Sequence, residues 1–223
     1  MKVLKILALT FSVALYTATI LAQETKLIPL TTNSEKALEL MRTVMANAEE
    51  FRGDDNPPLL EEILRLDPNF YFAKTYNSIL LENNTYRTNL NNAYENRSNV
   101  SEIEEKIIEA TYQQYINLNT VLADKIIDDL VSTYPDYYQL RLLSADLKNN
   151  LKDPYAKDSR YAEILEQNPN SFPALFRRAQ LHFPVDNDIV NFPIEERNTN
   201  LAASYLMKAA SLKPKNPGPQ RFL

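Results

Sequence analysis

The side chains that could take part in metal binding or acid–base chemistry are few in this sequence. A metal site or a general base needs several ligating or ionisable groups that converge. The chain has one histidine, His182, and no cysteine. Neither a pair of histidines at helical spacing nor an Asp-rich calcium-loop pattern is present, so the position of His182 favours a helix-end ring beside terminal carbonyls. The sequence predicts no metal site.

Adjacent acidic residues recur along the chain and invite comparison with the paired carboxylates of glycoside hydrolases. Neighbouring residues on a helix point about 100° apart, so two adjacent carboxylates seldom share one site. We therefore interpret these pairs as solvated helix faces. Examples are Glu49-Glu50, Glu61-Glu62, Glu104-Glu105 and Asp128-Asp129.

Composition excludes several further classes of protein. Only two glycines, Gly53 and Gly218, stand against thirteen prolines. Phosphate-binding loops, hydrolase elbows and tight β-hairpins need glycine, so α/β nucleotide-binding folds and common catalytic motifs are disfavoured. The net charge is −5, from 24 basic and 29 acidic side chains, and an acidic surface repels nucleic acid. We expect no enzyme activity, no cofactor and no nucleic-acid partner.

The first 22 residues have the pattern of a secretory signal peptide. Lys2 and Lys5 precede an apolar run from Ile6 to Ala22, and a polar sequence starts at Gln23. This order predicts export to the periplasm or the medium, with cleavage after residue 22. An uncleaved anchor is the alternative, although the run is short for a membrane span and contains four serine and threonine residues. We expect no other membrane insertion.

Prolines divide the rest of the chain at nearly regular intervals. Pro135 and Pro169 are 34 positions apart, Pro68 lies 67 before Pro135, and Pro214 lies 45 after Pro169. Apolar residues at i, i+4 and i+7 precede two of these prolines and predict one buried helix face each. The two sets are Ala123, Ile127, Leu130 and Ala202, Leu206, Ala209. Before Pro169 the corresponding small position is taken by Lys157.

The pattern predicts an all-α fold. Capping boxes are expected at Thr32 to Glu35 and at Ser101 to Glu104, and Asp153 should cap a helix that begins at Pro154. Two segments, residues 83–94 and 184–193, are expected to be loops or irregular helix. The predicted helices span 33–51, 57–66, 69–82, 86–95, 101–118, 120–133, 136–149, 154–167, 171–182 and 197–212.

From Pro29 to Leu223 the chain resembles bacterial tetratricopeptide-repeat proteins. The resemblance is carried by the 34-residue spacing and by motifs such as the Leu-Asp-Pro-Asn-Phe that ends at Phe70 and the acidic helix start at Ser101. It implies a right-handed α–α superhelix over residues 23–223, whose concave groove binds a protein or peptide. The family's tryptophan is absent, and its Leu-Gly pair is replaced, as in Ser144-Ala145.

The family's register implies which residues face the groove. Tyr112 and Tyr115 stand at i and i+3 on one helix, where they serve either as groove anchors or as packing between helices. The eight candidate groove residues are Thr75, Ile79, Tyr112, Tyr115, Leu142, Asp146, Phe176 and Gln180.

The sequence near the C-terminus predicts that the last helix of the solenoid is incompletely covered. Leu201, Leu206 and Met207 would be thinly covered after the last full helix. We therefore expect a repeat domain that is truncated, or one that self-associates there. Two other functions stay open, namely the N-terminal part of a longer exported enzyme and a glycan- or nutrient-binding envelope component.

Overall fold

Every regular element of the described chain is helical. The computed structural model describes residues 26–80, 84–150, 152–183 and 191–222, and within these ranges there is no β-strand. The predicted all-α class is therefore confirmed for this part. The predicted signal peptide, residues 1–22, lies outside it. None of the described helices has both the length and the apolar character needed to span a bilayer.

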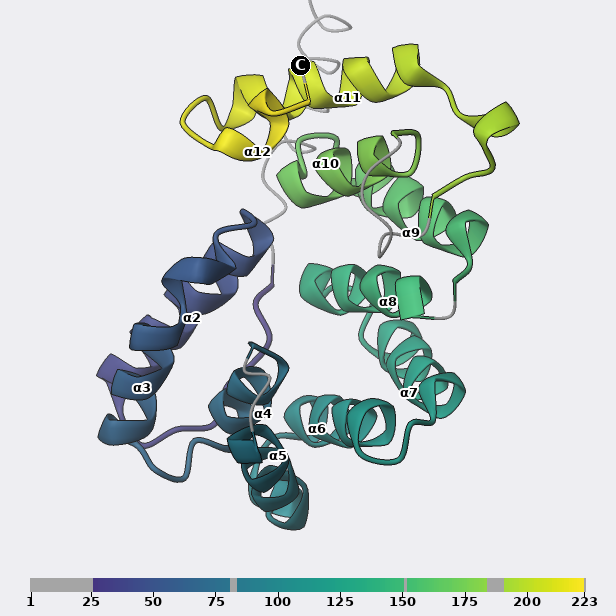
Figure 1. The fold of residues 1–223 in the computed structure, drawn as a ribbon. Helices are drawn as coiled ribbons and strands as arrows, with labels where there is room; N and C mark the ends of the chain where they lie inside the picture. The colour runs from purple at the N-terminus through teal and green to yellow at the C-terminus, as the bar shows by residue number, and fades with distance from the viewer. Residues whose placement is uncertain (1–25, 81–83, 151, 184–190, 223) are drawn as a thin grey trace, which may run out of the picture.

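The α-helices are numbered from α2, as in Figure 1, and three short 3₁₀ turns lie between them. Their bounds are α2 Glu35–Glu49, α3 Pro57–Leu66, α4 Tyr71–Leu80, α5 Asn84–Glu95, α6 Glu102–Tyr115, α7 Thr120–Thr133, α8 Tyr138–Asn150, α9 Pro154–Gln167, α10 Phe172–Gln180, α11 Thr199–Leu212 and α12 Pro217–Gln220. Most agree with the predicted ranges within a few residues. The Asn-rich segment is a regular helix, α5, and residues 184–190 lie outside the described part.

Consecutive helices pack as antiparallel hairpins. The most extensive contacts join α2 to α3, α4 to α5, α6 to α7, α8 to α9 and α10 to α11. Figure 1 shows these hairpins following one another around an arc, with the first helix of each hairpin on the inner side. The architecture is that of stacked helical hairpins.

The four punctuating prolines occupy the same local structure. Each lies one residue after the C-cap of a hairpin's second helix, and the C-cap carbonyl accepts a hydrogen bond from the N–H three residues on. Proline cannot continue the helix, so the helix ends at the residue before it. The four bonds are Phe70 N to Asp67 O, Tyr137 N to Tyr134 O, Ser171 N to Asn168 O and Asn216 N to Lys213 O, at 3.0–3.2 Å.

The buried faces of the second helices agree with the predicted periodicity. Both predicted sets of three apolar residues on α7 and α11 are buried, and so is the matching face of α9. That face carries Lys157, whose residue is only 2 % exposed, beside Tyr161 and Ile164. The small position of the repeat is therefore a core position even where the residue is a lysine.

The helix caps agree with prediction at two of three places. Ser101 and Glu104 form the predicted capping box of α6, and Asp153 caps α9. At α2 the cap is Ser34, which accepts the N–H of Ala37. The predicted cap, Thr32, instead donates its hydroxyl to Asp67, 35 residues later in the chain, at 2.6 Å.

The arc closes on itself through the C-terminal end of α2. Phe51 packs against Phe176, with ring centroids 4.7 Å apart. Lys213 pairs with Glu50 at 2.7 Å, and the side-chain amide of Asn216 donates to the Glu50 carbonyl at 2.6 Å. We call these contacts the seam. They join the end of α2 to α10 and to the turn between α11 and α12.

The C-terminal end is better covered than the sequence predicts at one position. Leu206 is 1 % exposed, because it packs in a cluster with Phe176 and Ala179 of α10. Met207, in contrast, is 57 % exposed. The predicted thin cover therefore holds for Met207 and is wrong for Leu206.

Residues 26–34 form an extended strap across the inner side of the arc. The N–H of Ile28 donates to the side chain of Gln139 on α8, and its carbonyl accepts from Arg42 on α2. Further along, the N–H of Thr31 donates to Glu104 of α6 at 2.9 Å. The strap thus ties together hairpins that are distant in sequence.

Candidate binding site

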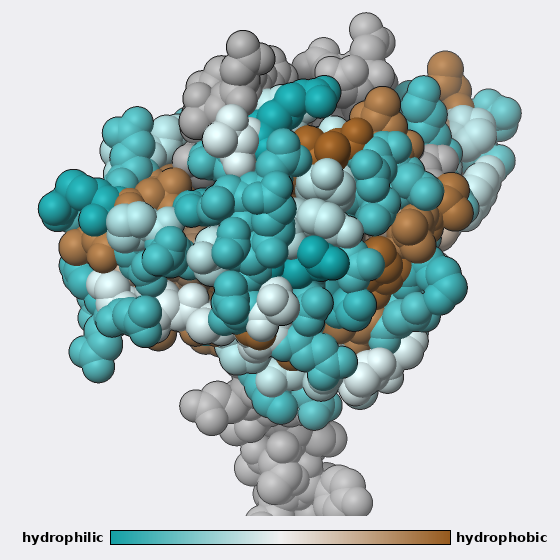
Figure 2. Space-filling view, turned by 90° about the horizontal axis from the view of Figure 1, so that it is seen from below, coloured by the Kyte–Doolittle hydropathy of each residue, from teal (hydrophilic) through white to brown (hydrophobic). Residues whose placement is uncertain are grey.

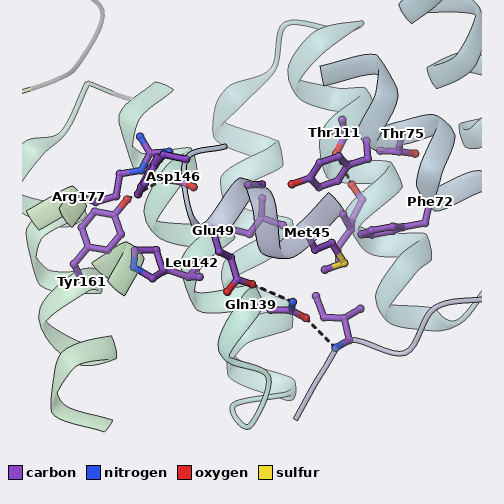
Figure 3. A pocket seen from close by; sticks show the side chains of 17 residues that line it. Met45, Glu49, Phe72, Thr75, Thr111, Gln139, Leu142, Asp146, Tyr161 and Arg177 are labelled. Carbon is purple, nitrogen blue, oxygen red and sulfur yellow. Dashed lines mark hydrogen bonds and ion pairs between the residues drawn. The ribbon is translucent and has the colours of Figure 1, made fainter. Parts of the chain in front are cut away.

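A cavity of about 220 Å³ lies at the centre of the arc. The first helices of all five hairpins, α2, α4, α6, α8 and α10, contribute to its wall, together with Tyr161 of α9 and Ile28 of the strap (Figure 3). Apolar side chains such as Met45, Phe72 and Leu142 line much of it. We call it the central cavity.

One end of the central cavity is polar. The Tyr161 hydroxyl donates to a carboxylate oxygen of Asp146 at 2.8 Å, and Arg177 Nε lies 3.6 Å from the same oxygen. The Arg177 guanidinium also stacks over the Phe51 ring, 4.5 Å from its centroid. The Asp146 side chain is 48 % exposed, so solvent reaches this end. Figure 3 places Tyr161, Asp146 and Arg177 side by side, away from Phe72 and Thr75.

A second carboxylate, that of Glu49, lies on the cavity wall. Gln139 Nε2 donates to Glu49 Oε1 at 3.2 Å, and Gln139 itself is oriented by the N–H of Ile28 (dashed in Figure 3). Burial raises the pKa of Glu49. The Gln139 hydrogen bond and the charge of Lys213 oppose this rise, and the neighbouring Glu50 charge adds to it. The Glu49 charge is therefore poorly solvated.

Phenol groups around the central cavity report its negative potential. Burial is the largest cause that raises the pKa of Tyr76, and the charges of Glu49 and Asp146 raise it further. Tyr115 responds in the same way to burial and to Asp146. For Lys157 the shift is downward: burial and the charge of Arg177 lower its pKa to about 8. The two phenols stay neutral and the amine stays protonated at neutral pH.

The central cavity brings together three of the eight predicted groove residues, Thr75, Leu142 and Asp146. Tyr112 stacks on Tyr94 of α5, with centroids 3.8 Å apart, which makes it a contact between helices. Tyr115 is 37 % exposed at the end of α6.

The remaining three predicted groove residues do not line the central cavity. Phe176 is buried in the seam, and Gln180 is buried with its Oε1 lacking a hydrogen-bond partner. Ile79 lies on α4, but its side chain is outside the described part.

His182 does not bind terminal carbonyls as the sequence predicts. Its Nδ1 accepts the N–H of Asn198 at 3.3 Å, and its ring stacks on Phe192. Burial lowers the pKa of His182, so the neutral ring that can accept this bond is favoured. Among the described residues, no group of three or more His, Asp or Glu side chains converges as a metal site.

Outside the central cavity, apolar residues are dispersed on the face shown in Figure 2. Hydrophilic side chains cover most of that face, and apolar ones gather in small separate patches. Among the exposed large apolar residues, Leu118 at 80 % and Val121 at 71 % lie close together at the turn between α6 and α7, whereas Ile194 at 79 % and Met207 at 57 % lie elsewhere in the chain. Single exposed apolar residues are ordinary on protein surfaces. The central cavity is therefore the better candidate site.

The poorly solvated charge of Glu49 leads to a stability prediction. Glu49→Gln should raise the midpoint of thermal unfolding by roughly 1–3 °C at pH 7, because it removes a half-buried charge and keeps an acceptor for Gln139. The folded pKa of Glu49 lies above its unfolded value of 4.5. The gain should therefore shrink as the pH falls through the raised pKa and vanish below 4.5. Thermal melts followed by circular dichroism would measure it, and a gain independent of pH would contradict the assignment.

Comparison with known proteins identifies no relative of this chain. No family model, no curated protein and no solved structure matches it.

Proposed function

We propose that this chain is an exported helical-repeat protein of the tetratricopeptide type that binds a protein or peptide partner on its concave side and has no catalytic activity of its own. The observation that carries the proposal is the central cavity, to which the first helix of every described hairpin contributes. In a solenoid the inner helices form the binding surface. The right-handed superhelix, bacterial origin and export to the periplasm or medium belong to the same proposal.

The size of the central cavity defines the mode of binding. The strap already occupies part of the inner side of the arc, and about 220 Å³ is too little for a stretch of peptide. One side chain fits. We therefore infer that a partner inserts a single anchoring side chain into the central cavity, while the rest of its contact lies outside.

Affinity capture tests this function with a pair of matched variants. The full chain serves as bait in an envelope extract of the cells that produce it. Ala48 lines the central cavity from α2, whereas Ala46 is exposed on another face of the same helix. Ala48→Phe should fill the cavity and reduce the captured partner at least tenfold, and Ala46→Phe should leave capture unchanged. Equal capture by both variants, or no protein captured at all, would overturn the proposal.

A further inference from the structure

The carboxylate of Glu49 forms no direct ion pair with any described side chain, and the charge of Lys213 acts on it only from a distance. Its one hydrogen bond comes from the neutral amide of Gln139. The cations nearby are engaged elsewhere, since Lys213 pairs with Glu50 and Arg177 lies against Asp146. A partly buried carboxylate without a counter-charge is costly. Among the residues that line the central cavity, two carboxylates, those of Glu49 and Asp146, stand against one cation, Arg177.

The walls around this charge suit a cation with an apolar stem. Phe51, Phe72, Tyr76 and Tyr161 line the central cavity, and the faces of aromatic rings attract ammonium and guanidinium groups. An anionic ligand would meet both Glu49 and Asp146. The one guanidinium on the wall, that of Arg177, already contacts Asp146 and the Phe51 ring. The charges thus select against an anion.

Volume limits the size of the occupant. An apolar cavity of about 150 Å³ accommodates benzene, so by proportion the central cavity of about 220 Å³ holds about nine non-hydrogen atoms. A lysine or arginine side chain falls within this limit, and its methylene stem would lie against apolar residues such as Met45 and Leu142.

We propose that the side chain received by the central cavity is basic, a lysine or arginine of the partner, whose charged end pairs with Glu49 while its stem packs on the aromatic and apolar walls. This inference rests on the proposed function and names the chemistry of the anchoring side chain. A bound cation would form a charge-assisted hydrogen bond with the poorly solvated carboxylate of Glu49, which favours a basic ligand over a neutral one.

Three small probes of equal length separate charge from apolar burial. Hexylammonium imitates the basic side chain, 1-hexanol has no charge, and hexanoate has the opposite charge. Calorimetric titration of the purified full chain should give the order hexylammonium, hexanol, hexanoate in falling affinity. Glu49→Gln should weaken hexylammonium binding at least tenfold and leave hexanol unchanged. Tighter binding of hexanoate than of hexylammonium, or no binding of hexylammonium, would overturn the proposal.

Glu39→Gln provides the matched control. Glu39 lies on the same helix, is 70 % exposed and pairs with Lys36, so its neutralisation changes the net charge equally but not the cavity. Hexylammonium should bind this variant as it binds the unaltered chain. Binding should also weaken as the pH falls through the raised pKa of Glu49. Equal losses in both variants would assign the effect to net charge and refute a specific role for Glu49.

The outcomes for the two proposals are distinguishable. A captured partner whose affinity is the same for Glu49→Gln and the unaltered chain would refute the basic anchor and leave the binding function intact. Hexylammonium binding that depends on Glu49, with no protein captured, would refute the partner-binding function and leave the cation site standing.

Discussion

Replacing Glu104 by alanine should lower the free energy of unfolding by roughly 3 kcal/mol. The Glu104 carboxylate is fully buried, and it accepts hydrogen bonds from the N–H and hydroxyl of Thr31 and from those of Ser101. Alanine leaves these donors without their acceptor at the start of α6. Because two donors belong to the strap, the substitution should also release residues 26–34 from α6. Urea denaturation followed by circular dichroism would measure the first effect, and hydrogen exchange at Thr31 the second.

Glu105→Ala is the control for this prediction. Glu105 is the next residue, half-buried, and its ion pair with Arg97 is long, at 3.9 Å. A partly exposed pair of this kind contributes little, so this variant should change the free energy of unfolding by less than about 0.5 kcal/mol. Similar losses in the two variants would mean that the hydrogen bonds of Glu104 do not hold the strap.

The features that could be predicted from the sequence depend on local contacts. Helix periodicity, the capping box at Ser101 and the turn at each proline all involve residues a few positions apart. These interactions are set by side-chain spacing and by the missing N–H of proline. The all-α class and the buried faces of α7 and α11 followed from them. The register of the resembled family added Thr75 on α4 and Leu142 and Asp146 on α8 to the residues that line the central cavity.

The inner face of the last hairpin differs from the predicted register. On α10 the central cavity is lined by Pro173 and Arg177, whereas the register predicted Phe176 and Gln180. A shift of one residue rotates a side chain by about 100° around the helix. Phe176 and Gln180 stand as far after Pro169 as Leu142 and Asp146 stand after Pro135, so α10 turns a neighbouring face toward the central cavity although the spacing of these prolines is regular. One cavity residue that was not predicted, Gln139, could have been found from the sequence, because it stands at helical spacing from Leu142 and Asp146 on α8.

Contacts between segments that are distant in the chain could not be predicted from local sequence patterns. Glu50 and Lys213 are 163 residues apart in the chain, and Thr32 caps no helix because Asp67 takes its hydroxyl. Both contacts arise only when the arc brings its two ends together and lays the strap across its inner side. Glu49 also looked like half of a solvated acidic pair. Its neighbour Glu50 is indeed partly solvated in the seam, while Glu49 lies on the cavity wall.

The seam gives the second large effect, at Phe51. This residue has a φ of 57°, in the left-handed region that side chains disfavour, and its ring packs on Phe172 and Phe176. Phe51→Ala loses the ring but keeps the strained backbone, and should cost about 2–3 kcal/mol. Phe51→Gly loses the same ring and relieves the strain, so it should be more stable than the alanine variant by about 1 kcal/mol. Urea denaturation of both variants would measure the difference.

The sign of this difference in unfolding free energy tests the prediction most directly, because a glycine variant is normally less stable than the alanine variant. At Ala46, on the exposed face of α2, Ala46→Gly should cost about 1 kcal/mol, since glycine has a low helix propensity. The alanine-to-glycine change should thus stabilise at position 51 and destabilise at position 46, five residues apart on one segment. If glycine destabilises at both, the left-handed conformation of Phe51 is not what ends α2. If loss of the ring has no effect in either variant, the seam does not hold the two ends of the arc together.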